Sequence, residues 1–205
     1  MKELAMSITR WLVIGISGTT CSGKTTLAKR LHENFQNSKL ISQDSYFLPE
    51  NDPRHVNIPE LNACNWELLS SLDMNKMHTD VFKILNMSND YTIKQSNEKN
   101  KWPETRVLIL EGFILFEDKK ISDLCNLKYL LTLNKQQCWE RRRNRVYDPP
   151  DVPGYFDSIV WPEYEKYLRE IKQNKKLQEE IVFIDGGENK EEIFQRVFND
   201  ISKRL

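Results

Sequence analysis

The chain has 205 residues, with 30 basic and 30 acidic side chains, so its formal net charge is zero. This balance excludes a global attraction to nucleic acid or to an anionic membrane surface, and we expect neither as a partner. The longest apolar run, residues 11–16, is too short for a membrane span or a signal-peptide core. We expect a single domain over residues 1–205, located in the cytoplasm as a monomer or weak oligomer.

The four cysteines, Cys21, Cys64, Cys125 and Cys138, are widely spaced along the chain. They form no C-x-x-C pair and have no histidine at a metal-site spacing, so we expect no structural metal site. Cysteines scattered in this way are typical of free thiols in a reducing compartment.

Residues 18–25 read G-T-T-C-S-G-K-T and fit the phosphate-loop pattern G-x-x-x-x-G-K-[ST] at every constrained position. The alternative is an ordinary glycine-rich turn, but the loop lies between an apolar run and a helix-forming stretch, residues 26–35, as an anion-binding loop requires. Lys24 can reach the terminal phosphates, and the Thr25 hydroxyl can ligate Mg2+. The expected nucleotide-binding residues here are Gly18, Thr19, Thr20, Cys21, Ser22, Gly23, Lys24, Thr25 and Thr26.

Four further apolar runs predict strands, at residues 39–42, 107–110, 128–133 and 181–184. Together with the run before the phosphate loop they make five short strands separated by helical or turn-rich sequence. This order predicts an α/β fold with three layers, built on a five-stranded parallel sheet.

The segments between the strands differ in character. Residues 48–65 contain three prolines and predict an irregular segment, whereas residues 66–86 carry apolar side chains at three- and four-residue spacing and predict a helix. A final amphipathic helix is predicted around Ile193 and Val197. Residues 1–10 predict an N-terminal extension, and residues 87–105 predict a solvated polar connection.

Two acidic residues follow predicted strands, at the sheet edge where α/β proteins bind ligands. Asp44 can lie near an acceptor hydroxyl, although an aspartate there can also serve as a turn or N-cap residue. Glu111 can hold Mg2+ directly or through water; the alternative is a solvated glutamate at a strand end. Because a kinase needs a proton acceptor and a second acid near the metal, we take Asp44, Glu111 and Lys24 as catalytic candidates.

An arginine cluster lies in a predicted helix that is followed by a proline- and glycine-rich turn. Arg141 and Arg145 are one helical turn apart and share a face, whereas Arg142 points about 100 degrees away. The cluster by itself favours the alternative of a solvated basic face paired with Glu140. Beside a phosphate loop, guanidinium forks are suited to phosphate oxygens and the segment can close as a lid.

Several motifs in this sequence together resemble the nicotinamide riboside kinases. They are I-S-Q-D at 41–44, L-E-G-F at 110–113, R-R-R-N-R-V-Y-D-P-P at 141–150, P-G-Y-F-D at 153–157 and V-W-P at 160–162. The resemblance runs from about residue 13 to residue 198, and the segment from 145 to 162 is its most specific part. It implies a P-loop kinase fold like that of nucleoside monophosphate kinases, with a small arginine-rich lid at about 141–157. It also implies phosphorylation of the ribose 5'-hydroxyl of nicotinamide riboside, or of nicotinic acid riboside, with ATP and Mg2+.

The resemblance also implies roles for individual residues. Asp44 corresponds to the proton acceptor and lies beside the metal, and Thr25 corresponds to the metal ligand. Arg141 and Arg145 correspond to the lid groups that contact ATP. The loop of Glu188, Asn189 and Lys190 corresponds to the one beside the nucleotide base. The implied substrate-binding residues are Asp44, Ser45, Tyr46, Phe47, Trp66, Glu67, Arg142, Tyr147 and Asp148.

Two aromatic residues correspond to the family's substrate sandwich, Trp66 and Tyr147. A pyridinium ring is cationic, so stacking between aromatic faces gains a cation-π attraction of up to about 2 kcal/mol when water is excluded. The alternative is that both are core or capping aromatics. The sequence departs from the family at Glu67, where the acid that binds the ribose hydroxyls is usually aspartate.

Two other functions are compatible with part of this pattern. A uridine or cytidine kinase can use the same fold, but a neutral pyrimidine gains little from the Trp66 and Tyr147 pair. A nucleotide-dependent switch protein without a small acceptor is the second alternative, although the sequence lacks the guanine-recognition motif N-K-x-D. We therefore expect a small nucleoside as the partner.

Overall fold

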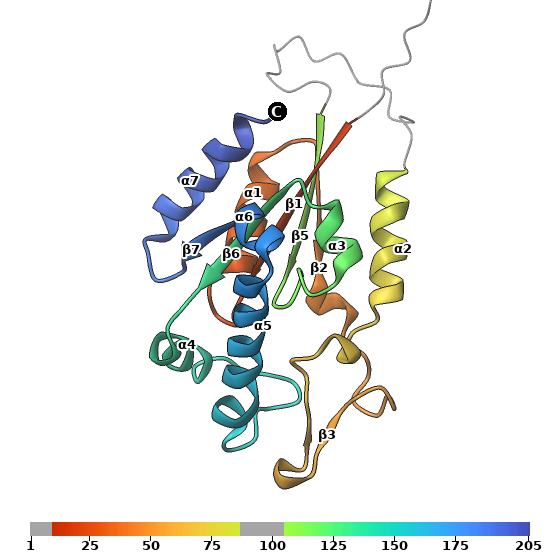
Figure 1. Cartoon of the computed structure of the whole chain (residues 1–205), viewed down its shortest axis with the longest axis vertical. Coiled ribbons are helices and arrows are strands. Elements are labelled where there is room, and N and C mark those ends of the chain that lie inside the picture. The colour runs from red at the N-terminus through yellow and green to blue at the C-terminus, as the bar shows by residue number, and fades with distance from the viewer. Residues whose placement is uncertain (1–9, 87–104) are drawn as a thin grey trace, which may run out of the picture.

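The computed structural model describes residues 10–86 and 105–205. The predicted N-terminal extension and polar connection therefore lie outside the described residues, except for Arg10 and Thr105, which begin strands. The central sheet has five parallel strands, as predicted, and their order is β2-β5-β1-β6-β7 (Figure 1). Their bounds are β1 Arg10–Gly18, β2 Ser38–Ser42, β5 Thr105–Gly112, β6 Leu127–Thr132 and β7 Ile181–Asp185.

The central strands are apolar on both faces because helices cover both sides of the sheet. In the middle of β5, Val107, Leu108, Ile109 and Leu110 are at most 2% exposed. The strand register also aligns the carboxyl ends, since Glu111 pairs with Ile16 of β1 on one side and with Ser42 of β2 on the other. The polar residues at these strand ends therefore meet at one edge of the sheet.

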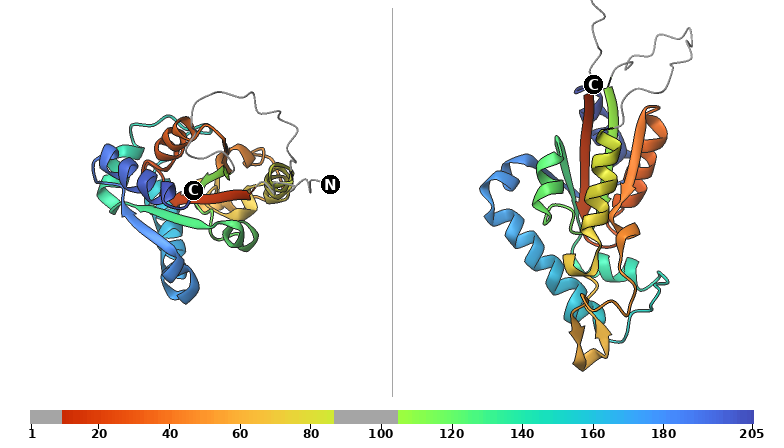
Figure 2. Two further views of the ribbon diagram at one scale, coloured as in Figure 1. Left: turned by 90° about the horizontal axis from the view of Figure 1, so that it is seen from above. Right: turned by 90° about the vertical axis from the view of Figure 1, so that its right-hand side faces the viewer.

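Helices form the two outer layers. Leu27 and Leu31 of α1 and Val197 and Ile201 of α7 share one apolar cluster with one face of the sheet. Met77 of α2, together with residues of α3 and α5, packs in a second cluster on the other face. Two views at right angles show this arrangement (Figure 2). The helix bounds are α1 Lys24–Asn34, α2 Met74–Leu85, α3 Lys119–Leu124, α4 Lys135–Arg142, α5 Trp161–Gln173, α6 Lys175–Glu180 and α7 Lys190–Ser202.

The helix predicted over residues 66–86 is wrong in its first part, because α2 begins only at Met74. Asp73 is its N-cap, and its side chain accepts a hydrogen bond from the backbone N–H of Lys76. Immediately before it, Asp73 donates its own N–H to the carbonyl oxygen of Tyr46, and the carbonyl oxygen of Ser71 accepts from Leu48. These tertiary hydrogen bonds hold the preceding residues in irregular structure, and Trp66 and Glu67 consequently lie in a loop.

Two further segments bear on the site. The irregular segment 48–65 contains a short antiparallel hairpin of β3 Asn57–Ile58 and β4 Ala63–Cys64, which projects beyond the carboxyl ends of the sheet (Figure 2). Helix α4 ends at Arg142, so the prediction that one helix carries Arg141 through Arg145 is wrong. In the part of the chain that the structure describes, no helix has the length and apolar character needed to cross a membrane.

Candidate active site

The phosphate loop connects β1 to α1 through backbone geometry that suits glycine. Gly18 has φ 147°, and a Cβ atom there would lie 2.2 Å from the carbonyl oxygen of Leu131. Gly23, with φ 96°, is the N-cap residue of α1. Lys24, the first residue of that helix, is 6% exposed. The loop therefore presents a helix N-terminus and one shielded cation at the edge of the sheet, which is an anion-binding arrangement.

Glu111 lies directly beside the phosphate loop and is fully buried. The hydroxyl of Thr25 donates a hydrogen bond to its Oε2 at 3.0 Å, and the hydroxyl of Ser42 donates to its Oε1. These two bonds account for both carboxylate oxygens, so Glu111 is a partner of the predicted metal ligand Thr25. The alternative of a solvated strand-end glutamate is excluded.

The oxygen atoms at this edge of the sheet are chemically suited to bind a magnesium ion. The Thr25 hydroxyl, the Glu111 carboxylate and the exposed Asp44 carboxylate are hard oxygen donors of the kind that Mg2+ prefers. Among residues 10–86 and 105–205, no three His, Cys, Asp or Glu side chains cluster closely enough to hold a metal by themselves. This is consistent with Mg2+, which usually keeps water and phosphate oxygens in its coordination shell.

A cavity of about 400 Å³ extends from the phosphate loop toward the β3–β4 hairpin. Its walls come from the phosphate loop, the short 3-10 helix Gln43–Tyr46, the loop containing Trp66, the end of β5 and the segment after α4. Four segments that are far apart in sequence thus form one enclosure with the loop. The lining residues are Thr20, Lys24, Asp44, Phe47, Leu48, Glu50, Trp66, Glu67, Phe113, Arg142, Arg145, Tyr147, Asp148, Pro149, Asp151 and Tyr155.

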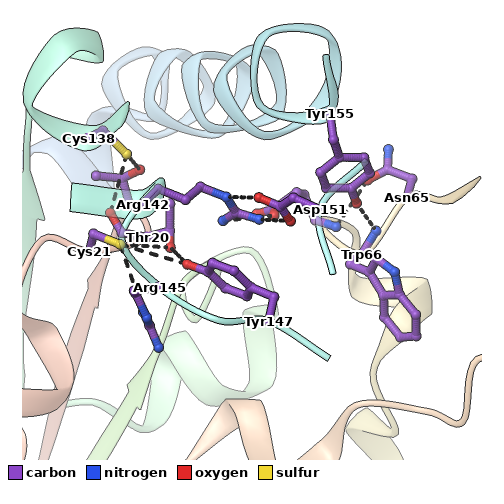
Figure 3. Close-up of polar contacts among 12 residues, drawn as sticks. Thr20, Cys21, Asn65, Trp66, Cys138, Arg142, Arg145, Tyr147, Asp151 and Tyr155 are labelled. Atoms are coloured by element: carbon purple, nitrogen blue, oxygen red, sulfur yellow. Dashed lines mark hydrogen bonds and ion pairs between the residues drawn. The ribbon is translucent and has the colours of Figure 1, made fainter. Parts of the chain in front are cut away.

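Trp66 and Tyr147 both line this cavity but are held differently. The backbone N–H of Trp66 donates to the Tyr155 hydroxyl at 2.9 Å, and its ring lies 5.8 Å from that of Phe47 in an edge contact. The Tyr147 hydroxyl shares a 3.1 Å hydrogen bond with Thr20 of the phosphate loop. Burial raises the pKa of Tyr147 to about 12, against the opposing hydrogen bond from Thr20. Its phenol is therefore neutral at physiological pH. Figure 3 shows the Tyr147 hydroxyl directed at Thr20.

Arg142 also lines this cavity. Only 5% of its side chain is exposed, and its Nε and Nη2 atoms donate to the two carboxylate oxygens of Asp151 at 2.6 and 2.8 Å. Its guanidinium carbon lies 4.3 Å from the centre of the Tyr147 ring. Burial opposes the charged form, but the hydrogen bond with Asp151 and then the charge of Glu67 outweigh it and raise the pKa of Arg142. Figure 3 shows the paired contact between Arg142 and Asp151. Arg142 is thus permanently charged and packs against the ring of Tyr147.

Glu67 lies beside this cation, with its Oε1 atom 3.9 Å from Nη1 of Arg142. Burial raises the pKa of Glu67 to about 7, although Arg142 and Lys24 both lower it. Asp151 and Asp44 add to the increase because their negative charges are nearby. Glu67 therefore changes its charge near neutral pH, which is unusual for a glutamate.

The other two arginines reach the phosphate loop. Arg141 donates from Nη1 to the carbonyl oxygens of Cys21 and Gly186, at 3.2 and 3.0 Å. Arg145, beyond the end of α4, approaches the Cys21 sulfur at 3.9 Å. Tertiary folding therefore brings both arginines to one loop, although they do not share a helix.

A smaller cavity, about 30 Å³, lies on the other side of the phosphate loop. Ser22, Thr26, Arg141 and Lys190 are among its lining residues. The neighbouring predicted residues have other partners in this structure. Glu188 forms an ion pair with Arg196 at 2.9 Å, and Asn189 caps α7.

Two predicted substrate-binding residues do not line the large cavity. Tyr46 is 8% exposed in the core and donates its hydroxyl proton to Asp80, while the neighbouring Ser45 is exposed. Conversely, sequence reasoning missed Asp151, Tyr155 and Phe113 as lining residues. Asp151 lies in the proline- and glycine-rich turn, and Tyr155 belongs to the P-G-Y-F-D motif at 153–157. The sequence therefore marks both segments, but it does not show which residues they contact.

Comparisons with solved structures define the class of the protein. The chain is similar to thymidylate kinase from Candida albicans, with 17% identity, a TM-score of 0.56 and coverage of 95% of this chain and 92% of that one. It is also similar to a possible uridine kinase from Bacillus stearothermophilus, with 17% identity, a TM-score of 0.50 and coverage of 89% and 92%. A family model described as an AAA domain matches residues 14–162. The family model shows that the chain belongs to the AAA-domain class of phosphate-loop proteins, and the two structures show that it shares the fold of these kinases.

Curated relatives then specify the family. Human nicotinamide riboside kinase 1 is 37% identical over 193 residues, covering 94% of this chain and 93% of that protein. Mouse nicotinamide riboside kinase 2 is 37% identical and covers 95% and 97%. The uridine kinase of Anoxybacillus flavithermus is more distant, at 26% identity, with 87% and 88% covered. The chain belongs to the nicotinamide riboside kinase family.

Proposed function

We propose that this protein transfers the terminal phosphoryl group of ATP to the ribose 5'-hydroxyl of nicotinamide riboside, and also of nicotinic acid riboside, in NAD biosynthesis. The observation that carries the proposal is the shared cavity. Lys24 and Asp44 line the same enclosure as Trp66 and Glu67, so phosphate-binding and riboside-binding groups are in one space. Proximity of this kind is most of what a phosphoryl-transfer enzyme provides.

In this mechanism the chain's own groups act on both substrates. Lys24 and the N–H groups of the phosphate loop bind the triphosphate, while Arg141 and Arg145 stabilise charge on the transferring group. Asp44 accepts the proton of the ribose 5'-hydroxyl while the 5'-oxygen forms a bond to the terminal phosphorus of ATP. The bond from that phosphorus to the bridging oxygen breaks, and ADP leaves.

Thr25 and Asp44 would hold Mg2+, with Glu111 fixing Thr25 by the hydrogen bond described above. When bound, the ion neutralises negative charge on the phosphates.

On the acceptor side, Glu67 accepts hydrogen bonds from the ribose hydroxyls, and Trp66 and Tyr147 contact the pyridinium ring. Arg142 lies against both Glu67 and Tyr147, which supports a role in keeping these groups in place. We further propose that residues 141–157 act as a lid, because they carry cavity residues from a segment that joins α4 to the next helix.

The test is phosphate transfer from ATP to a panel of nucleosides with the purified protein. We expect turnover of nicotinamide riboside and nicotinic acid riboside, with uridine and cytidine at least about tenfold poorer by kcat/KM because neutral rings lose the cation-π attraction. No phosphorylation of either pyridine riboside would overturn the proposal. Preferred turnover of uridine would favour the pyrimidine kinase alternative, and ATP hydrolysis without any acceptor would favour the switch protein.

A further inference from the structure

A buried histidine lies against Trp66 without reaching the cavity. His55 is 8% exposed and is not among the lining residues. Its ring centroid lies 4.4 Å from that of Trp66, and the two ring planes are inclined at 62°. Aromatic rings prefer such tilted contacts, so His55 supports the tryptophan ring through direct packing.

Both ring nitrogens of His55 also face oxygen atoms. Nε2 lies 2.9 Å from the carbonyl oxygen of Pro49, which can only accept, and Nδ1 lies 3.2 Å from Oγ of Ser71. The single hydroxyl proton of Ser71 is donated to the carbonyl oxygen of Asn65, 2.7 Å away. Nε2 therefore donates to Pro49, and Nδ1 lies within hydrogen-bond distance of the Ser71 hydroxyl.

Hydrogen bonds of Ser71 and Asn65 connect His55 to Glu67, one of the proposed riboside-binding residues. Asn65, only 6% exposed, accepts at Oδ1 from the backbone N–H of Glu67 at 3.0 Å. Its side-chain nitrogen donates to Glu163 of α5 at 2.9 Å. Buried polar networks hold one geometry when every member is satisfied. The loop that carries Trp66 and Glu67 is thus connected to His55 on one side and to α5 on the other.

We infer that His55 is a positioning residue for riboside binding. Its ring packs against Trp66. Its contact with Ser71 connects it, through Asn65, to the backbone of Glu67. Its Nε2 atom donates a hydrogen bond to Pro49 in the preceding segment. The inference rests on the proposed function, because it concerns the wall proposed to bind the riboside. His55 does not touch the substrate, and its loss is expected to change riboside affinity rather than the phosphate-transfer step.

The test compares His55→Phe, which keeps a ring against Trp66 but removes both ring nitrogens, with wild type. We expect the KM for nicotinamide riboside to increase about tenfold, as the loss of these buried polar contacts suggests, with the KM for ATP and kcat changed less than about twofold. His55→Asn and His55→Gln each place an amide nitrogen near one of the two ring nitrogens, and each is expected to restore part of the affinity. His78→Phe is the matched control, since His78 pairs with Asp118 and does not line the cavity.

A second measurement does not depend on activity. Acrylamide quenching of Trp66 fluorescence, obtained by difference from Trp66→Phe, should increase in His55→Phe and not in His78→Phe. Unchanged riboside KM and unchanged quenching would overturn the inference, as would an equal rise in the KM for ATP. If His55→Phe does not fold, the Asn and Gln variants decide by the same measurements. Wild type that fails to phosphorylate the riboside would overturn the proposed function alone, because the quenching result still tests the position of Trp66.

Discussion

The two ends of the cavity are built in different ways. The phosphate loop is one continuous stretch between β1 and α1, and its neighbours Glu111 and Ser42 come from strands in register with each other. The proposed acceptor end combines Trp66 from a loop, Arg142 from the end of α4 and Tyr155 from the segment after it. Tyr155 is hydrogen-bonded to Trp66, and Arg142 to Asp151. The first end depends on backbone geometry and the second on side-chain partners. Substitutions at the two ends should therefore affect different kinetic constants.

Asp44→Ala should have the largest effect, because it removes the proposed proton acceptor at the boundary between the two ends. We expect kcat to fall by about 10³-fold while nucleotide affinity remains. Steady-state kinetics with nicotinamide riboside and titration with a non-hydrolysable ATP analogue measure the two effects. Normal turnover in this variant would exclude Asp44 from catalysis.

Gly18→Ala tests how strongly the phosphate-loop end depends on its backbone. The new Cβ would lie 2.2 Å from the Leu131 carbonyl oxygen at a φ of 147°, so we expect a loss of about 3 kcal/mol in the free energy of unfolding. Gly23→Ala is the comparison, because its Cβ meets no atom within 4 Å and only the positive φ is unfavourable, at about 1 kcal/mol. Chemical denaturation measures both, and equal losses would contradict the role assigned to Leu131.

Arg142→Lys tests the side-chain partners at the acceptor end. Lysine cannot make the paired contact with Asp151 or stack on Tyr147 as a planar group does. We expect the KM for nicotinamide riboside to rise about 30-fold, with the KM for ATP little changed. The exposed Arg143, which does not line the cavity, provides Arg143→Lys as a control. If the KM values for nicotinamide riboside and for ATP rise equally, Arg142 does not act on riboside binding alone.

The smallest expected effect is the pH dependence contributed by Glu67, whose pKa burial raises to about 7. Its carboxylate should bind ribose hydroxyls better when ionised, so the KM for nicotinamide riboside should fall up to about tenfold between about pH 6 and about pH 8. Glu67→Gln should have a flatter profile over the same range. An unchanged profile in the variant would assign the titration to another group.

Ionisation of Glu67 should also affect protein stability. Riboside binding is expected to improve as the pH rises, whereas the free energy of unfolding is expected to decrease. Because the folded-state pKa lies above the ordinary value of 4.5, folding favours the protonated form. Relative to Glu67→Gln, wild type should lose stability as the pH rises from about 4.5 to about 7, by at most about 3 kcal/mol. Denaturation at several pH values checks this, and a constant difference between the proteins would contradict the raised pKa.

The sequence by itself determined the phosphate-loop end and the five-stranded sheet. Residues 18–25 form a contiguous motif, and the strands are short apolar runs, so both signals are local. The strand ends also placed Asp44 and Glu111 at the correct edge, because parallel strands share one direction.

Only the tertiary structure decided the acceptor end. The apolar spacing from residue 66 onward is that of a helix, yet hydrogen bonds from residues 71–73 to residues 46–48 delay α2 until Met74. The contacts of Arg142 with Glu67 and of Tyr155 with Trp66 depend equally on segments that are distant in sequence. Periodicity reports which residues are buried along one element, whereas a hydrogen bond between distant loops leaves no spacing that a sequence can display.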